Sequence, residues 1–329
     1  MRLLAREREG SLTARHAAMA HRPLRIGTRG SPMALAQTGM VRDRIAAAHP
    51  HLAEPGAMEL VVVNTVADRI LDRPLSAIGG KGLFTKELEQ ALFAGEIDVA
   101  VHSMKDVETW LPDGLVIACI LERDDPRDAF LSLASGSLAE LPAGARVGTS
   151  SLRRGAQVLM RRPDLRIVPL RGNANTRIRK LEEGVCDATL LAIAGLERLG
   201  LAHLARTVIP VEEMLPAVAQ GALGIECRAA DEDVIALLQA VACPRTTTAL
   251  AAERGLLAEL DGSCRTPIAA LAQIDGDRLT LDGLLFLPDG SAHWATTRSG
   301  PAAEAASIGR EAGADLKAQA GETYRRHLQ

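Results

Sequence analysis

The stretch IDVAVHSMKDV, residues 97–107, is the part of the sequence that most strongly indicates the fold. Its first half alternates small and apolar residues in a pattern rich in β-branched side chains, which predicts a short buried strand. Lys105 and Asp106 follow where this strand should end, and strand ends in an open α/β sheet face the ligand crevice. An adjacent acid and base is more often a solvated loop pair, so this stretch indicates a site only together with the rest of the chain.

The composition is that of a globular protein with a substantial core. Hydrophobic residues make up 47% and charged residues 24% of 329 residues, a length that suits two or three domains. Five cysteines without a CxxC pair disfavour a disulfide framework and a zinc site, and suit a reducing compartment. No apolar run reaches the roughly 18 residues that span a bilayer. Residues 1–22 lack an apolar signal core, which favours a disordered extension or a misplaced start. We expect no membrane partner and a cytoplasmic location.

Strands that alternate with helices predict a first α/β lobe with a parallel sheet and right-handed crossovers. The expected strands are residues 24–28, 58–64, 97–101 and 115–121. Arg29 and Ser31 lie between the first strand and its helix, a position that favours an anion. The glycine cluster at 79–82 lacks the spacing of a phosphate-binding loop, and predicts a mobile loop that brings Lys81 and Phe84 toward a ligand.

The charged run 122–130 is expected to cross into a second lobe that repeats this scheme. Its strands are expected at residues 146–150, 165–170 and 187–193, each followed by a helix. Two strand-to-helix junctions carry arginines, TSSLRR at 149–154 and LRGNANTR at 170–177. Repeated cations at helix starts indicate an anionic ligand. The residues expected to point into one crevice are Arg153, Arg154, Arg171 and Arg177.

The rest of the sequence predicts a return to the first lobe and then a third domain. A small-residue turn and strand at 217–227 are expected to carry the chain back, and a helix at 231–241 to complete the first lobe. From about residue 244, a helix, three antiparallel strands and a last helix predict a small domain whose loop presents Cys264.

The predicted fold class is therefore α/β, with two periplasmic-binding-protein-like lobes joined by a hinge and a small α+β C-terminal domain. The expected boundaries are a disordered extension at 1–22, domain 1 at 23–121 and 217–241, domain 2 at 122–216, and domain 3 at 242–329.

A clamp lined with guanidinium groups suits a ligand with several carboxylates or phosphates. Aromatic residues are only 2% of the chain and the formal net charge is −3, which together disfavour a nucleic-acid partner. Cys264 lies in a glycine-flanked loop beside Arg265, where a nearby cation favours the thiolate, although a loop cysteine is more often structural. The residues alone leave the reaction open. A non-catalytic two-lobed binding protein for a polycarboxylate explains the clamp, but gives Cys264 and the third domain no role.

The sequence resembles the porphobilinogen deaminase family from about residue 24 to past residue 300. The resemblance is carried by long motifs in one order: TRGSP at 28–32, GGKGLFTKELE at 79–89, AVHSMKDV at 100–107, ERDDPRDAF at 122–130, GTSSLRR at 148–154, LRGN at 170–173, LPAVAQGALGIEC at 215–227, and GSCRTPI at 262–268.

This resemblance implies the activity of hydroxymethylbilane synthase. A dipyrromethane cofactor is expected on Cys264 through a thioether, and four porphobilinogen molecules are added to its free end with loss of ammonia before hydrolysis releases the linear tetrapyrrole. The catalytic aspartate of the family falls on Asp106, whose carboxylate would help to protonate the leaving amine and stabilise a cationic pyrrole. The resemblance also implies no metal, a monomer, and a product passed to uroporphyrinogen-III synthase.

Cofactor and substrate contacts are assigned by the same resemblance to residues that mostly carry cations, hydroxyls or amides. These residues are Arg29, Ser31, Gln37, Lys81, Phe84, Ser103, Lys105, Thr149, Ser150, Arg153, Arg154, Arg171, Gly172, Arg177, Arg198 and Gln220. The acetate and propionate groups that every pyrrole of this chemistry carries would account for the arginines.

Overall fold

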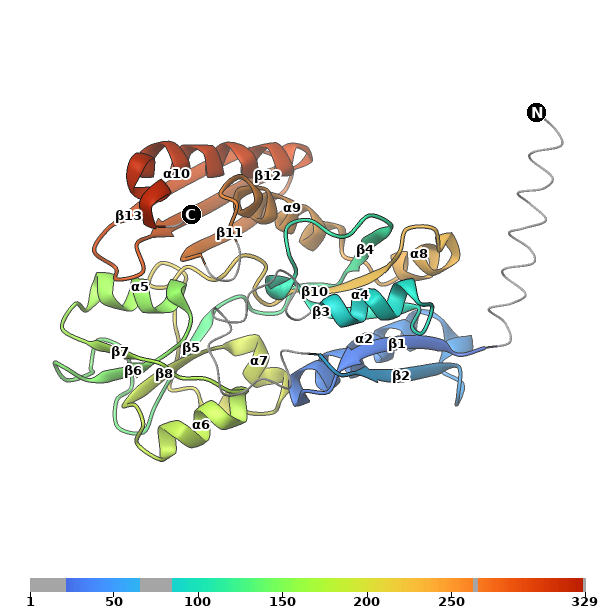
Figure 1. Ribbon diagram of the computed structural model, residues 1–329, viewed down its shortest axis with the longest axis horizontal. Helices are drawn as coiled ribbons and strands as arrows, with labels where there is room; N and C mark the ends of the chain where they lie inside the picture. The colour runs from blue at the N-terminus through green and yellow to red at the C-terminus, as the bar shows by residue number, and fades with distance from the viewer. Residues whose placement is uncertain (1–21, 66–84, 263–265, 328–329) are drawn as a thin grey trace.

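The computed structural model in Figure 1 consists of three parts, each built on its own β-sheet. It describes residues 22–65, 85–262 and 266–327, with side chains of the last helix described as far as residue 323. In this view the first lobe lies to the right, the second lobe to the left, and the third domain, in orange and red, at the top.

The first lobe is a mixed sheet with helices packed against it. Its elements are β1 (Leu24–Arg29), α2 (Pro32–Ala48), η1 (Pro50–Leu52), β2 (Met58–Val63), α4 (Lys86–Phe93), β3 (Val99–Ser103), η2 (Met104–Asp106), β4 (Leu115–Ile120), β10 (Leu223–Arg228) and α8 (Glu232–Gln239). The strand order is β2-β1-β3-β10-β4. β1 is parallel to β2 and β3, whereas β10 is antiparallel to both of its neighbours. β3 lies in the middle of this sheet, which places its end, and Asp106 after it, at the centre of the lobe.

The second lobe has the same plan. Its elements are β5 (Asp128–Ser132), β6 (Arg146–Gly148), α5 (Leu152–Arg161), β7 (Arg166–Val168), α6 (Ala174–Glu182), β8 (Ala188–Ala192), α7 (Ile193–Arg198), η3 (Ala202–Leu204) and β9 (Thr207–Val208). The strand order is β7-β6-β8-β5-β9, and β5 is antiparallel to β8 and β9. Ser151 begins α5 and Asn173 begins α6, because each side chain accepts a hydrogen bond from a backbone N–H of the first turn.

The third domain is an antiparallel sheet whose one face is covered by two helices (Figure 1). Its elements are α9 (Pro244–Glu259), β11 (Ile268–Asp275), β12 (Arg278–Phe286), β13 (His293–Pro301), η4 (Ala302–Glu304) and α10 (Ala305–His327). Leu256 of α9, Leu281 of β12 and Leu316 of α10 are fully or almost fully buried in its core. The same core includes Met104 and Val107, so the third domain supports the turn that carries Lys105 and Asp106.

Two crossings connect the lobes, residues 122–127 and 209–222, and they lie side by side. Arg123 Nε donates to the carbonyl oxygen of Gln220 at 2.8 Å, and the Asp124 N–H donates to that of Gly221 at 3.3 Å. Gly221 has φ +90°, and a Cβ at this position would lie 2.5 Å from the Asp124 carbonyl oxygen. The close approach of the two crossings therefore requires glycine here.

Glu253 of α9 ties both crossings to the third domain. Its carboxylate is fully buried and accepts hydrogen bonds from the Arg123 guanidinium, from the N–H of Ala219 at 2.7 Å, and from the N–H of Ala272 at 2.9 Å. The hinge between the lobes is thus anchored on a helix of the third domain.

These observations confirm the predicted fold class and the return of the chain into the first sheet. The expected parallel sheets are wrong in one respect, because β10 and β5 run antiparallel to their neighbours. Each of these strands directly follows a crossing, so it enters its sheet from the opposite end. The expectation that residues 122–130 only cross between lobes is also wrong from Asp128 onward, where β5 begins. The numerical domain boundaries stay predictions.

Within the described residues, no single helix combines the length and apolar character needed to cross a membrane; α8 and α9 meet that test only as a pair bent by 111°.

Candidate active site

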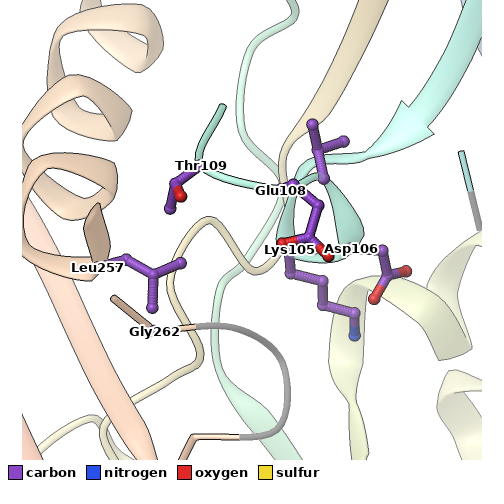
Figure 2. A pocket seen from close by; sticks show the side chains of 7 residues that line it. Lys105, Asp106, Glu108, Thr109, Leu257 and Gly262 are labelled. Atoms are coloured by element: carbon purple, nitrogen blue, oxygen red, sulfur yellow. The ribbon is translucent and has the colours of Figure 1, made fainter. Parts of the chain in front are cut away.

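The pocket that contains Asp106 lies where β3 ends against the third domain. β3 ends at Ser103, and the 3-10 turn η2 then carries Lys105 and Asp106. The lining residues are Lys105, Asp106, Val107, Glu108, Thr109, Leu257 and Gly262. Figure 2 shows Lys105 and Asp106 next to each other, with Leu257 and Gly262 on the side of α9. Gly262, which lines this pocket, precedes Cys264 by two residues in the sequence.

Arg254 of α9 holds the chain that follows Asp106, and sequence reasoning missed it. Its Nη1 donates to the carbonyl oxygen of Val107 at 3.1 Å, and its Nη2 donates to that of Glu108. Burial lowers the pKa of Arg254, although Glu108 opposes this effect. The sequence feature that could have indicated Arg254 is an arginine among the apolar and small residues of a predicted helix.

Lys105 lies in an unusual electrostatic environment. Burial lowers the pKa of Lys105 to about 8, and the positive charges of Arg154 and Arg153 act in the same direction, while Asp106 and Asp128 oppose it. Residues of the second lobe therefore lie within electrostatic range of the turn after β3. The ammonium group is poorly solvated, which favours an anionic partner.

Residues of the first lobe that were predicted to bind ligand gather at the ends of β1 and β3. Arg29 is the last residue of β1, and Ser31 caps α2 by accepting a hydrogen bond from the N–H of Ala34 at 3.2 Å. Gln37 is buried in α2, and its Nε2 donates to Ser103 Oγ at 2.7 Å. The structure thus brings α2 and the end of β3 together through two of the predicted residues.

Residues at the start of α5 are held by the backbone of their own lobe. Thr149 Oγ1 accepts a hydrogen bond from the Ser151 N–H at 3.1 Å, and Ser150 Oγ donates to the carbonyl oxygen of Leu170 at 3.1 Å. These bonds fix the turn between β6 and α5, from which Arg153 and Arg154 extend.

Arg153 and Arg154 bind a buried carboxylate that sequence reasoning did not single out. Asp128 is fully buried and forms ion pairs with Arg153 Nη2 at 2.8 Å and with Arg154 Nη2 at 2.7 Å. Both side chains, which were expected to point into a crevice, are only 5% and 7% exposed and are paired with Asp128, which the expectation did not include. The signal for Asp128 was an acid directly before the apolar AlaPheLeu of β5.

The start of α6 contributes Arg171, Gly172 and Arg177. Gly172 has φ +114°, and a Cβ there would lie 2.5 Å from the Thr176 side chain, so only glycine fits. Arg177 Nε donates to the Gly172 carbonyl oxygen at 2.8 Å. Burial lowers the pKa of Arg177 to about 10, with Arg154 and Arg171 acting in the same direction and Asp106 opposing. Arg177 therefore lies within electrostatic range of Asp106, across the boundary between the lobes.

Two predicted ligand contacts, Gln220 and Arg198, lie at the crossings. Gln220 Nε2 donates to the carbonyl oxygen of Pro126 at 2.7 Å and to Asp128 Oδ1 at 3.0 Å. Arg198 Nε donates to Asp124 Oδ2 at 2.9 Å, and its Nη2 donates to the carbonyl oxygen of Gly221 at 2.6 Å. Arg198 thus binds both crossings, and its contacts in the structure are those of a hinge residue.

Three predicted site residues, Lys81, Phe84 and Cys264, lie outside the described residues. Among the residues that the structure does describe, no three His, Cys, Asp or Glu side chains gather in a way that could hold a metal ion.

The arrangement places Asp106 among several cations contributed by both lobes. Lys105 and Asp106 come from the end of β3, Arg153 and Arg154 from α5, and Arg177 from α6. The cations suit a ligand with several carboxylates, and the carboxylate of Asp106 can hold a proton or stabilise a positive charge on that ligand.

Comparison with known families gives two matches that together span most of the chain. The model of the porphobilinogen deaminase dipyromethane cofactor binding domain matches residues 24–236, and that of the porphobilinogen deaminase C-terminal domain matches residues 247–318.

Similar proteins include the chloroplastic porphobilinogen deaminase of Oryza sativa subsp. japonica, 54% identical over 309 residues, which cover 93% of this chain and 86% of that protein. The porphobilinogen deaminase of Paracoccus denitrificans is 55% identical over 298 residues, covering 91% of this chain and 95% of that protein. Among solved structures, the methionine binding protein MetQ is 16% identical with a TM-score of 0.42, covering 68% of this chain and 91% of MetQ.

Proposed function

The chain belongs to the porphobilinogen deaminase family, and on this premise we propose that it catalyses the hydroxymethylbilane synthase reaction (EC 2.5.1.61). Four porphobilinogen molecules are condensed head to tail on a dipyrromethane, ammonia leaves at each addition, and hydrolysis releases hydroxymethylbilane. The observation that carries this proposal is the position of Asp106. It lies among cations of both lobes and in the same pocket as Gly262, which leads to Cys264.

The described residues fit a dipyrromethane with several carboxylate groups. Arg153 Nε is a buried donor without a hydrogen-bond partner among the described residues, and burial lowers the pKa of Lys105 to about 8 and that of Arg177 to about 10. Unsatisfied donors and desolvated cations favour an anionic ligand that completes their bonding. When bound, this cofactor supplies the free pyrrole carbon to which the first substrate is joined. Cys264 lies outside the described residues, two positions along the chain from Gly262, which lines the pocket.

Asp106 is the residue that donates the proton and stabilises the positive charge in each addition. The C–N bond of the aminomethyl group would break and its nitrogen would leave as ammonia after accepting one proton. A C–C bond would then form at a pyrrole carbon, and the proton released from that carbon can return to the Asp106 carboxylate. The carboxylic acid form of Asp106 can donate to the departing nitrogen, and the carboxylate then stabilises the positive charge left on the pyrrole. Lys105 and the arginines bind the carboxylates of the rings and keep them in line with Asp106.

The remaining parts of the proposal concern the protein as a whole. We infer that it acts as a cytoplasmic monomer and that its product passes to uroporphyrinogen-III synthase. The absence of a CxxC pair supports a reducing compartment.

The direct test is incubation of the purified protein with porphobilinogen. We expect one ammonia released for each porphobilinogen consumed, and one hydroxymethylbilane for each four consumed. A protein that binds porphobilinogen but returns it unchanged, with no ammonia, would instead be the non-catalytic binder of a polycarboxylate.

A further inference from the structure

Asp128 lies where the two crossings meet the arginine-bearing helix α5. It is the first residue of β5 and has no exposed surface. Its Oδ1 accepts hydrogen bonds from Arg154 Nε at 3.1 Å, from Arg154 Nη2 at 2.7 Å and from Gln220 Nε2 at 3.0 Å. Its Oδ2 accepts one from Arg153 Nη2 at 2.8 Å. Donors from α5 and from the second crossing therefore converge on one carboxylate.

The two arginines are held in different ways. Arg153 also donates from Nη1 to the carbonyl oxygen of Leu215 at 2.8 Å, which ties α5 to the second crossing. Arg154 is bound along one edge of its guanidinium, through Nε and Nη2, and its Nη1 takes part in no hydrogen bond with the described residues. A guanidinium fixed along one edge has a set orientation and presents its remaining nitrogen to a partner.

The charge of Arg154 acts on the same two cationic groups as the charge of Asp106. Arg154 lowers the pKa of both Lys105 and Arg177, and Asp106 raises the pKa of the same two groups. Burial alone would raise the pKa of Asp128, but Arg153 and Arg154 hold it well below its usual range. Asp128 is therefore ionised at neutral pH and compensates part of the positive charge buried beside the site.

We propose that Asp128 is a positioning residue that holds Arg154 in the orientation in which this arginine binds a carboxylate of the pyrrole ligand. Asp128 itself need not touch the ligand, because both of its oxygens accept hydrogen bonds from protein donors. The inference rests on the proposed function, which supplies a ligand with carboxylate groups.

The test compares Asp128→Asn with the wild-type protein, purified in the same way. The first readout is the fraction of chains that carry the dipyrromethane mass in intact-mass spectra. Asparagine keeps the shape but loses the charge, so we expect the loaded fraction to fall about tenfold, the effect of one charge-assisted hydrogen bond. For the chains that are loaded, we expect KM to rise with kcat little changed, because the orienting bond serves ground state and transition state alike.

Asp98→Asn is the matched control. Asp98 is also a buried carboxylate bound by arginines, Arg22 at 2.8 Å and Arg25 at 3.0 Å, but it precedes β3, at the other end of the strand from Asp106. We expect it to lower the thermal unfolding midpoint while the loaded fraction and KM stay at wild-type values. Wild-type loading in Asp128→Asn, or an equal loss of loading in both variants, would overturn the proposal.

Arg154→Lys keeps the test decisive if Asp128→Asn fails to fold. Lysine retains a positive charge beside Asp128 but lacks the fork that Asp128 orients, so we expect the same loss of loading. Loading of Arg154→Lys at the wild-type level would overturn the proposal as well. A wild-type protein without the added mass would refute the proposed function itself, whereas a loaded wild type with an equally loaded Asp128→Asn refutes only the positioning role.

Discussion

At the scale of single residues, the proposed chemistry depends on the carboxylate of Asp106, which follows the end of β3. Asp106 is held in the 3-10 turn η2, whose neighbours Met104 and Val107 are buried in the core shared with the third domain. Arg254 fixes the following carbonyl groups from α9. The backbone of Asp106 is thus set by packing on both sides, while its side chain lines the pocket.

Replacing Asp106 with asparagine should leave a folded protein that reacts very slowly. The amide keeps the shape of the side chain but can neither donate the acid proton nor stabilise a cation, so we expect kcat to fall by about 10²- to 10⁴-fold. Steady-state kinetics together with thermal unfolding would check this. Turnover close to that of the wild type would remove Asp106 from its catalytic role.

Lys105 should give the reaction a characteristic dependence on pH. Since burial lowers the pKa of Lys105 to about 8, its ammonium form is lost as pH rises through that value, and kcat/KM should fall there with the binding of carboxylates. Lys105→Arg keeps its charge and should lose this fall. A decline that persists unchanged in Lys105→Arg would assign it to another group.

The same pKa has a consequence for stability. Between about 8 and 10.5 the unfolded chain binds more protons at Lys105 than the folded protein does, so the contribution of this residue to the free energy of unfolding rises with pH in that window.

Sequence reasoning found some site residues and missed others for a physical reason. The position of Lys105 and Asp106 just after a strand could be predicted because a buried strand is a local pattern, while their roles were assigned by the family resemblance and stay predictions. Asp128 and Arg254 could not be predicted, because their roles depend on partners brought together by tertiary packing. Asp128 is separated along the chain by 25 residues from Arg153 and by 92 from Gln220.

At the scale of elements, the arrangement of the strands follows from the two crossings. Most strands and helices could be located from periodicity, since apolar alternation and helix caps are local signals. The antiparallel direction of β5 and β10 could not be predicted from the sequence, because it depends on the end from which the chain enters each sheet. β5 also begins with Asp128, and a charged residue at its start hid this strand in the charged run before it.

Gly221→Ala should weaken the contact between the crossings. A Cβ at this position has a positive φ and would lie 2.5 Å from the Asp124 carbonyl oxygen, so we expect the free energy of unfolding to fall by about 2 to 4 kcal/mol. Gly56→Ala is the control, because Gly56 has φ +85° but nothing within 4 Å of its Cβ position, and should lose only about 1 to 2 kcal/mol. Urea unfolding measures both, and equal losses would show that the close approach costs nothing.

At the scale of the whole molecule, the three parts meet at the site. The first lobe supplies Asp106, the second supplies the arginines of α5 and α6, and the third contributes Leu257 and Gly262 to the lining of the pocket. Glu253 links both crossings to the third domain by hydrogen bonds, so a helix of that domain holds the connection between the lobes. This arrangement suits a tethered chain that grows past a fixed acid.

The measurement that bears most directly on this account is the intact mass of the purified protein beside that of Cys264→Ser, each also treated with Ehrlich's reagent for dipyrromethanes. The wild type should exceed the variant by the mass of one dipyrromethane beyond the change of side chain, and only the wild type should react with the reagent. A wild-type protein that weighs no more than its polypeptide and gives no reaction would contradict the account.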